Sequence, residues 1–122
     1  MRPISTRVRN EIDADPVYRY CLRALALKDH VCQGRITREH AVIYGGKQVD
    51  EKWAIVPICA YAHNVDQYQD CGILNKEINV WIALNRMTAE DEAKYPRRNW
   101  GREREVLNKK YGVLSYAQLT DI

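Results

Sequence analysis

The sequence predicts an α+β fold in which a β-hairpin is joined to several helices. Residues 35–44 are rich in β-branched and aromatic side chains, and a second apolar run covers residues 53–58. Gly45 and Gly46 mark a turn between the two runs, so we expect a hairpin with a longer loop through residues 48–52.

The part of the chain before the hairpin divides in two. Residues 1–15 are polar, and we expect them to form an irregular N-terminal arm. Asp15 suits a helix N-cap and Pro16 suits a first helical position. Apolar residues then recur at helical spacing as far as Leu25, which predicts a helix; a strand over residues 18–22 is the alternative.

The part after the hairpin is expected to be helical. A stripe of apolar residues predicts an amphipathic helix over residues 74–87 that packs on the hairpin. Thr88 and Asp91 have the spacing of a capping box, which starts a short helix that Pro96 must end. A third helix is expected over residues 100–111.

Length and composition indicate one ordinary globular domain, which we place at residues 16–122. The chain has 122 residues, of which 46% are hydrophobic and 29% charged. No apolar run approaches the roughly 20 residues of a membrane span, and the N-terminus lacks the apolar stretch of a signal peptide. We therefore expect a protein of the cytoplasm with no membrane partner.

The net charge of +3 is small, but the basic residues are clustered. One group crowds the C-terminal quarter and another the N-terminus, as suits contact with phosphate groups. A solvated helix face is the alternative, since Glu103 and Glu105 interrupt the C-terminal group. The C-terminal group comprises Arg97, Arg98, Arg102, Arg104, Lys109 and Lys110.

Four cysteines offer ligands for a structural zinc ion. Cys32 lies just before the first expected strand and Cys59 just after the second, so a hairpin brings them together. Cys21, Cys71 or His30 would complete such a site. The alternative is that Cys21 and Cys71 are small buried apolar residues, which is common for cysteine thiols.

One histidine lies on the first expected strand and a second follows the hairpin, and a carboxylate precedes the first. His40 follows Glu39 within the first strand, and His63 lies just beyond the second. Hydrolysis of a phosphodiester requires a base that activates water and a cation that stabilises charge on the phosphate. A neutral histidine supplies the first, and a carboxylate with a second histidine can hold the cation.

These residues, taken in order, resemble the HNH, or ββα-metal, endonuclease family, especially its small phage and prophage members. The family run resembles C-x-G-R-I-T-x-E-H, a Gly-Lys turn, and W-A-I-x-P-L-C-x-x-H-H, and the resemblance spans about residues 21–112. The matching positions are Cys32, Gly34, Arg35, Ile36, Thr37, Glu39, His40, Gly46, Lys47, Trp53, Ala54, Ile55, Pro57, Cys59 and His63.

The resemblance implies a ββα-metal core at about residues 31–87 with a helical extension at 88–122, and it implies roles for single residues. His40 matches the general base, while Glu39 and His63 match ligands of a catalytic Mg²⁺, Mn²⁺ or Ni²⁺ ion. Zinc-containing members imply a structural Zn²⁺ at Cys21, Cys32 and Cys59. Contacts with DNA are expected at Arg35, Arg38, Lys47, Arg97, Arg98 and Arg102.

The sequence also departs from the family pattern. Ala62 stands where relatives carry a cysteine or histidine, so Cys71 must replace that zinc ligand or the zinc is absent. Gln67 stands at a further ligand position of the catalytic ion, for which Asp66 is a neighbouring candidate. The central asparagine of the family has no clear counterpart.

Three functions follow from this pattern. The first is a metal-dependent endonuclease that hydrolyses DNA and is encoded by a phage or prophage, acting in the cytoplasm of the bacterial host. The second is a zinc-stabilised accessory protein of phage recombination or replication that binds DNA without cutting it. The third is a protein-interaction domain that uses its tyrosine-rich surface.

Overall fold

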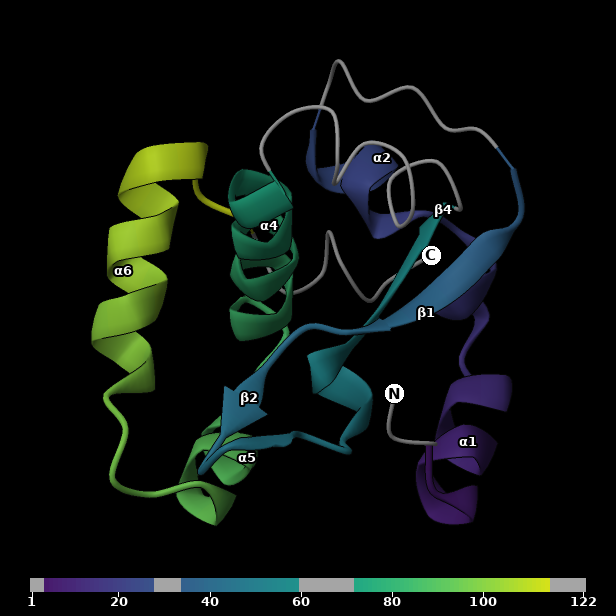
Figure 1. Cartoon of the computed structure of the whole chain (residues 1–122), viewed down its shortest axis with the longest axis horizontal. Coiled ribbons are helices and arrows are strands. Elements are labelled where there is room, and N and C mark those ends of the chain that lie inside the picture. The colour runs from purple at the N-terminus through teal and green to yellow at the C-terminus, as the bar shows by residue number, and fades with distance from the viewer. Residues whose placement is uncertain (1–3, 28–33, 60–71, 115–122) are drawn as a thin grey trace.

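The computed structural model describes residues 4–27, 34–59 and 72–114 and has an α+β fold (Figure 1). Strand β1 (Ile36–His40) pairs antiparallel with β4 (Ile55–Cys59). A smaller antiparallel pair, β2 (Ile43–Tyr44) and β3 (Lys47–Gln48), extends from the end of β1. The α+β class predicted from the sequence is confirmed.

The expected hairpin is present, although its strands are shorter than the apolar runs. Gly45 and Gly46 form the turn between β2 and β3 with φ of 58° and 79°, a left-handed geometry that side chains disfavour. The chain then passes through the 3₁₀-helix η2 (Lys52–Ala54) before entering β4. The loop predicted at residues 48–52 therefore begins in a strand and ends in a helical turn.

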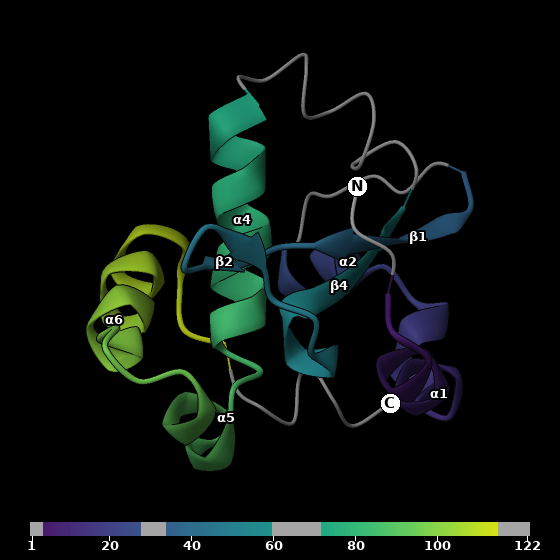
Figure 2. The same cartoon turned by 60° about the horizontal axis from the view of Figure 1, so that its bottom comes forward.

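Strand β4 is the buried centre of the fold. All five of its residues are buried, while those of β1 are half-buried. One edge of β4 pairs with β1, and three helical elements pack against the rest of the strand (Figure 2): η1 (Pro16–Arg19), α2 (Leu22–Ala26) and α4 (Gly72–Leu84). Pro57 is tolerated in this strand because its register places its nitrogen toward the edge that β1 does not occupy.

The predicted irregular arm is wrong, because residues 6–13 form a helix. Helix α1 (Thr6–Asp13) is capped by Ser5, whose side chain accepts a hydrogen bond from the backbone N–H of Val8. Val8 and Ile12 are four residues apart, and both are fully buried. Two apolar residues among many charged ones do not form a pattern from which this helix could be predicted.

The single helix predicted after Asp15 is divided, and the alternative strand over residues 18–22 is wrong. Asp15 does cap η1 (Pro16–Arg19), as the sequence predicts, by accepting from the N–H of Val17. Tyr20 then has an extended backbone, and α2 (Leu22–Ala26) begins after Cys21. The break lets buried residues on both sides, Val17 and Leu22, reach the same core.

The C-terminal helices follow the prediction closely. Helix α4 (Gly72–Leu84) lies beside α6 (Trp100–Tyr111), and the short α5 (Ala89–Lys94) joins them (Figure 1). Thr88 and Asp91 form the expected capping box of α5. Helix α4 ends earlier than predicted, and the side chain of Asn85 bonds back to the carbonyl of Trp81.

One hydrophobic cluster runs through all these elements, from Val8 in α1 to Leu114 beyond α6. Its aromatic part joins the hairpin to α5 and α6, where Tyr44 and Trp53 contact the rings of Tyr95 and Trp100 at centroid distances of 5.2–6.1 Å. Within the described residues, no helix is both long and apolar enough to cross a membrane.

Candidate functional site on the paired strands

Glu39 and His40 are neighbours at the end of β1 and so point to opposite faces of the strand. Glu39 lies opposite Val56, and His40 lies opposite Ile55. Both side chains are half-buried, and the Nε2 atom of His40 is enclosed by protein. A ligand that touches both residues must therefore reach them around the edge or the end of β1.

Polar side chains complete the edge of β4 near the His40 end. The carbonyl oxygen of Ile55 accepts hydrogen bonds from the Tyr18 hydroxyl (2.6 Å) and from Nη1 of Arg86 (3.0 Å). The same two donors reach the carbonyl of Lys52, and the Arg86 guanidinium lies over the Tyr18 ring. Burial raises the pKa of Tyr18 to about 12, against the opposing effect of Arg86.

Two of the predicted zinc ligands are brought together at the other end of the same strand. Cys21, just before α2, accepts a hydrogen bond through Sγ from the backbone N–H of Cys59 (3.3 Å). Both thiols are buried, and neither forms a disulfide. Thiolate sulfur is a preferred zinc ligand, but this contact joins Cys21 Sγ to the backbone of Cys59, and a structural site needs four ligands.

The other predicted metal ligands lie outside the described residues. These are Cys32, His63, Asp66 and Cys71. Among residues 4–27, 34–59 and 72–114, no group of three or more His, Cys, Asp or Glu side chains is placed to hold a metal ion. The described part of the chain thus supplies fragments of both predicted metal sites.

The basic residues predicted on the hairpin are accessible to different degrees. Arg35 and Lys47 are exposed. Arg38 lies opposite Pro57 on β1, and its Nη2 atom forms an ion pair with Asp13 at the end of α1 (2.9 Å). More than a third of the Arg38 side chain remains exposed, so this ion pair does not close it to solvent.

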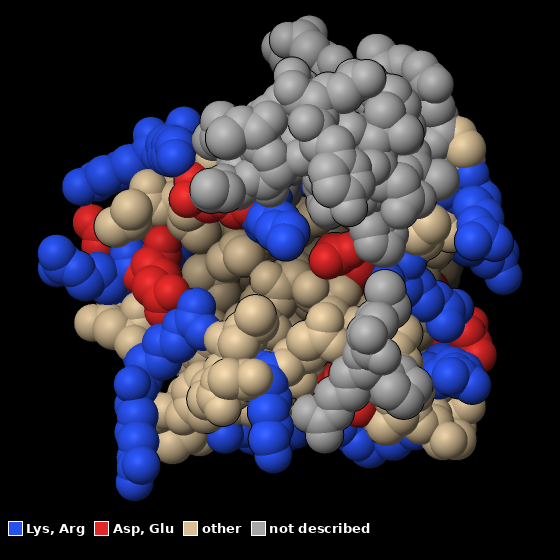
Figure 3. All heavy atoms as spheres, viewed as in Figure 1, with Lys and Arg blue, Asp and Glu red and all other residues tan. Residues whose placement is uncertain are grey.

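The basic residues predicted near α6 have different roles. Arg98 braces the fold: it bonds both carboxylate oxygens of Glu103 (2.7 and 2.8 Å), donates to the carbonyl of Ile43 and stacks on Trp100. Arg97 and Arg102 are exposed, and Arg97 has a left-handed backbone with φ of 74°. Basic side chains project over α6 at the left of Figure 3, with acidic residues between them.

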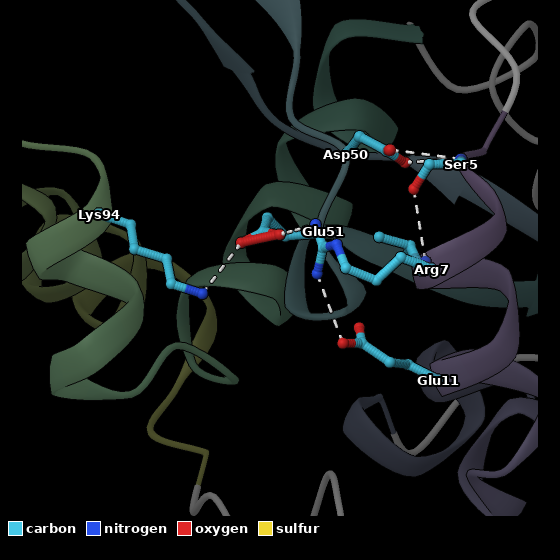
Figure 4. Close-up of polar contacts among 7 residues, drawn as sticks. Ser5, Arg7, Glu11, Asp50, Glu51 and Lys94 are labelled. Atoms are coloured by element: carbon cyan, nitrogen blue, oxygen red, sulfur yellow. Dashed lines mark hydrogen bonds and ion pairs between the residues drawn. The ribbon is translucent and has the colours of Figure 1, made fainter.

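Sequence analysis missed a charged cleft formed by α1, η2 and α5. Glu51 is buried at 6% exposure and accepts a bond from Arg7 (2.7 Å), with Lys94 on its other oxygen at 3.8 Å (Figure 4). This interaction raises the pKa of Arg7. A glutamate between Asp50 and Lys52 in a predicted loop gives no sign of burial, so the cleft could be found only from the structure.

Comparisons with known proteins do not identify the chain. No protein-family model matches it, and no curated protein or solved structure gives a significant match. The functional argument therefore rests on the residues and geometry of this protein.

Proposed function

We propose that this protein is a metal-dependent endonuclease of the HNH, or ββα-metal, type that hydrolyses phosphodiester bonds of DNA. One observation carries the proposal: the Glu39-His40 pair ends a strand that is paired antiparallel with β4, and the next described element is α4. This is the order of strand, strand and helix that the resemblance implies, and the order of the motif residues along the chain supports it.

The chain is long enough to bring His63 toward His40. Register places Cys59 opposite Ile36, so Cys59 and His40 are separated by four residues of strand, about 13 Å. His63 follows Cys59 by four residues, which span at most about 14 Å when extended. The extended length of four residues is thus about equal to the separation that a shared site would require.

In the proposed reaction, His40 accepts a proton from water as the water oxygen attacks phosphorus. The bond from phosphorus to the 3′-oxygen then breaks, leaving a 5′-phosphate and a 3′-hydroxyl after that oxygen is protonated. Glu39 and His63 would hold a divalent ion, and that ion would neutralise charge on the phosphate.

The decisive experiment is plasmid nicking by metal-stripped protein that is resupplied with Mg²⁺, Mn²⁺ or Ni²⁺. Replacement of the general base, His40→Ala, is expected to lower the cleavage rate by about 10²–10⁴-fold, the usual contribution of general base catalysis. Tyr20→Phe is the control, since Tyr20 is exposed and has no role in the motif. Equal rates for the wild type and His40→Ala would exclude the assigned base.

A second function is favoured by the pair Cys21 and Cys59. Buried sulfur ligands support a structural zinc ion without requiring catalysis, so a zinc-stabilised DNA-binding protein of phage recombination or replication is the alternative. This alternative predicts affinity for DNA that falls steeply with salt, and no cleavage with any divalent ion. Cleavage that is lost in His40→Ala would exclude it.

A further inference from the structure

A cleft of about 360 Å³ opens between α1, η2 and α5. Neither Glu39 nor His40 lines it, although Arg86, which bonds the carbonyl of Ile55 opposite His40, does. Its walls are mostly charged, with four basic side chains (Arg7, Lys52, Arg86 and Lys94) and four acidic ones (Glu11, Asp15, Glu51 and Asp91), together with Trp53 and Thr88.

Most charges of this cleft are already balanced by neighbours. Arg7 pairs with Glu51 and Glu11, and Lys52 pairs with Asp15 at 3.1 Å. Arg86 is the exception. It is only 4% exposed and has no carboxylate within ion-pair distance among the described residues, only backbone carbonyls and the Tyr18 ring.

Two buried N–H donors of the cleft residues also lack acceptors. Nε of Arg86 and Nε1 of Trp53 are both enclosed, and neither has a hydrogen-bond partner in the described part of the chain. The other two tryptophans differ in this respect: Trp81 donates to Asn108 and Gly112, and Trp100 donates to Tyr95. Leaving a buried donor unpaired costs about 1–3 kcal/mol, so native structures rarely tolerate two in one place.

We propose that this cleft binds a small phosphate-bearing anion, whose oxygens accept hydrogen bonds from Arg86 and Trp53. An oxyanion offers acceptors to these two unpaired donors and a negative charge to Arg86, which has no carboxylate partner among the described residues although four carboxylates line the cleft. Lys94 stands at the Glu51 side of the cleft, 3.8 Å from a carboxylate that Arg7 also contacts (Figure 4). The volume accommodates inorganic phosphate or a mononucleotide.

The three tryptophans provide a direct test by NMR. Addition of inorganic phosphate, at constant ionic strength set with chloride, is expected to shift the indole N–H resonance of Trp53 in a saturable manner. The indole resonances of Trp81 and Trp100 should stay in place, because their N–H groups already have acceptors. A site with a Kd of about 1 mM would be about nine-tenths occupied at roughly 10 mM phosphate.

Variants then assign the contact to the cleft. Arg86→Gln should weaken phosphate binding by at least about tenfold, since it removes a charge-assisted bond. If that variant does not fold, Lys94→Gln serves instead, with about a twofold loss, because Lys94 is 62% exposed. Lys109→Gln is the matched control, an exposed lysine paired with Glu105 on α6 and away from the cleft.

The same titration distinguishes a nucleotide ligand from free phosphate and shows whether the cleft binds an anion at all. A nucleoside 5′-monophosphate that binds more tightly than phosphate would identify a nucleotide, and equal affinities would identify the phosphate group alone as the ligand. A Trp53 resonance that does not move, or that moves equally with chloride, would overturn the proposal and leave buried water as the acceptor for both donors. This outcome is independent of the plasmid-nicking assay, which tests the proposed nuclease site on β1 and β4.

Discussion

The two ends of strand β4 differ in the chemistry that completes the edge not occupied by β1. At the Cys59 end, the backbone N–H donates to a buried thiol, Cys21. At the Ile55 end, the backbone carbonyl accepts from a hydroxyl and a guanidinium, Tyr18 and Arg86. One end is neutral and closed, whereas the other carries charge and borders the cleft.

Under the zinc and nuclease proposals, the two ends of β4 would have different roles. A neutral, buried pair of sulfur atoms suits a metal that stabilises the fold, because soft ligands and exclusion of water favour zinc. A charged end that also bears His40 suits reactions with anions, because positive groups there attract phosphate. Stability and chemistry would then respond separately to substitution at the two ends.

The largest expected effect lies at the cysteine end. If zinc is held there, Cys59→Ser should lower the free energy of unfolding by more than about 4 kcal/mol, as loss of a structural metal does. Urea unfolding with and without a chelator measures this, and the chelator should destabilise the wild type but not the variant. Without zinc, the cost should be only the roughly 1–3 kcal/mol of a buried hydroxyl.

Cys59→Ala is the control for that comparison, because it removes the sulfur without burying a hydroxyl. Under the zinc proposal, a chelator no longer changes the stability of either variant, and both variants are purified without bound zinc. If a chelator does not change the stability of the wild type, Cys21 and Cys59 are packed thiols that bind no zinc. The two ends of β4 would then not differ in metal binding.

A smaller effect is expected at the other end from Tyr18→Phe. At neutral pH, loss of the hydroxyl that serves the carbonyls of Lys52 and Ile55 should cost about 1–2 kcal/mol, and Arg86 still donates to both. The folded pKa of Tyr18 is about 12, above the ordinary value of 10.0. The stability it contributes is therefore complete below pH 10 and is lost as the pH rises toward 12.

Chemical unfolding of the wild type and Tyr18→Phe between pH 8 and 12 checks this sign, and the two stabilities should converge as the pH rises. Comparison with the variant cancels the titration of other tyrosines and lysines. Tyr20→Phe provides the matched control at an exposed phenol, where the change should be small. A difference between wild type and Tyr18→Phe that stays constant over this range would show that the Tyr18 hydroxyl is not buried as the structure has it.

Local signals in the sequence predicted much of the fold. The capping box at Thr88, the turn at Gly45 and Gly46, and the helix over residues 100–111 depend on nearby residues, so they could be identified without the rest of the chain. Helix α1 could not, because it is stabilised by burial of Val8 and Ile12 against distant elements. The break at Tyr20 has the same origin, since tertiary packing there overrides a continuous helical pattern.

The site was predictable only where the strand pairing sets the geometry. The contact of Cys21 with Cys59 was one of the options considered, whereas the predicted pairing of Cys59 with Cys32 lies outside the described residues. The brace role of Arg98 was not visible, because its partners are Glu103 and a carbonyl far away in sequence. The sequence alone does not show which arginine of a basic cluster contacts protein and which is exposed to solvent.

The smallest expected effect on stability lies midway between the two ends, at Arg38. Its ion pair with Asp13 joins two side chains that are 37% and 57% exposed, so Arg38→Gln should change the free energy of unfolding by less than about 1 kcal/mol. If Arg38 contacts DNA, the same variant should lower the slope of log affinity against log salt by about one. Fluorescence anisotropy with labelled duplex at several salt concentrations measures that slope.

Asp13→Asn breaks the same ion pair from the other side and leaves the arginine available to phosphate. Both variants should therefore have nearly equal stability, while only Arg38→Gln loses affinity for DNA. Asp13→Asn should bind at least as tightly as the wild type, because a carboxylate that competes with phosphate has been removed. If the wild type, Arg38→Gln and Asp13→Asn bind DNA equally, Arg38 only joins α1 to β1 and does not contact DNA.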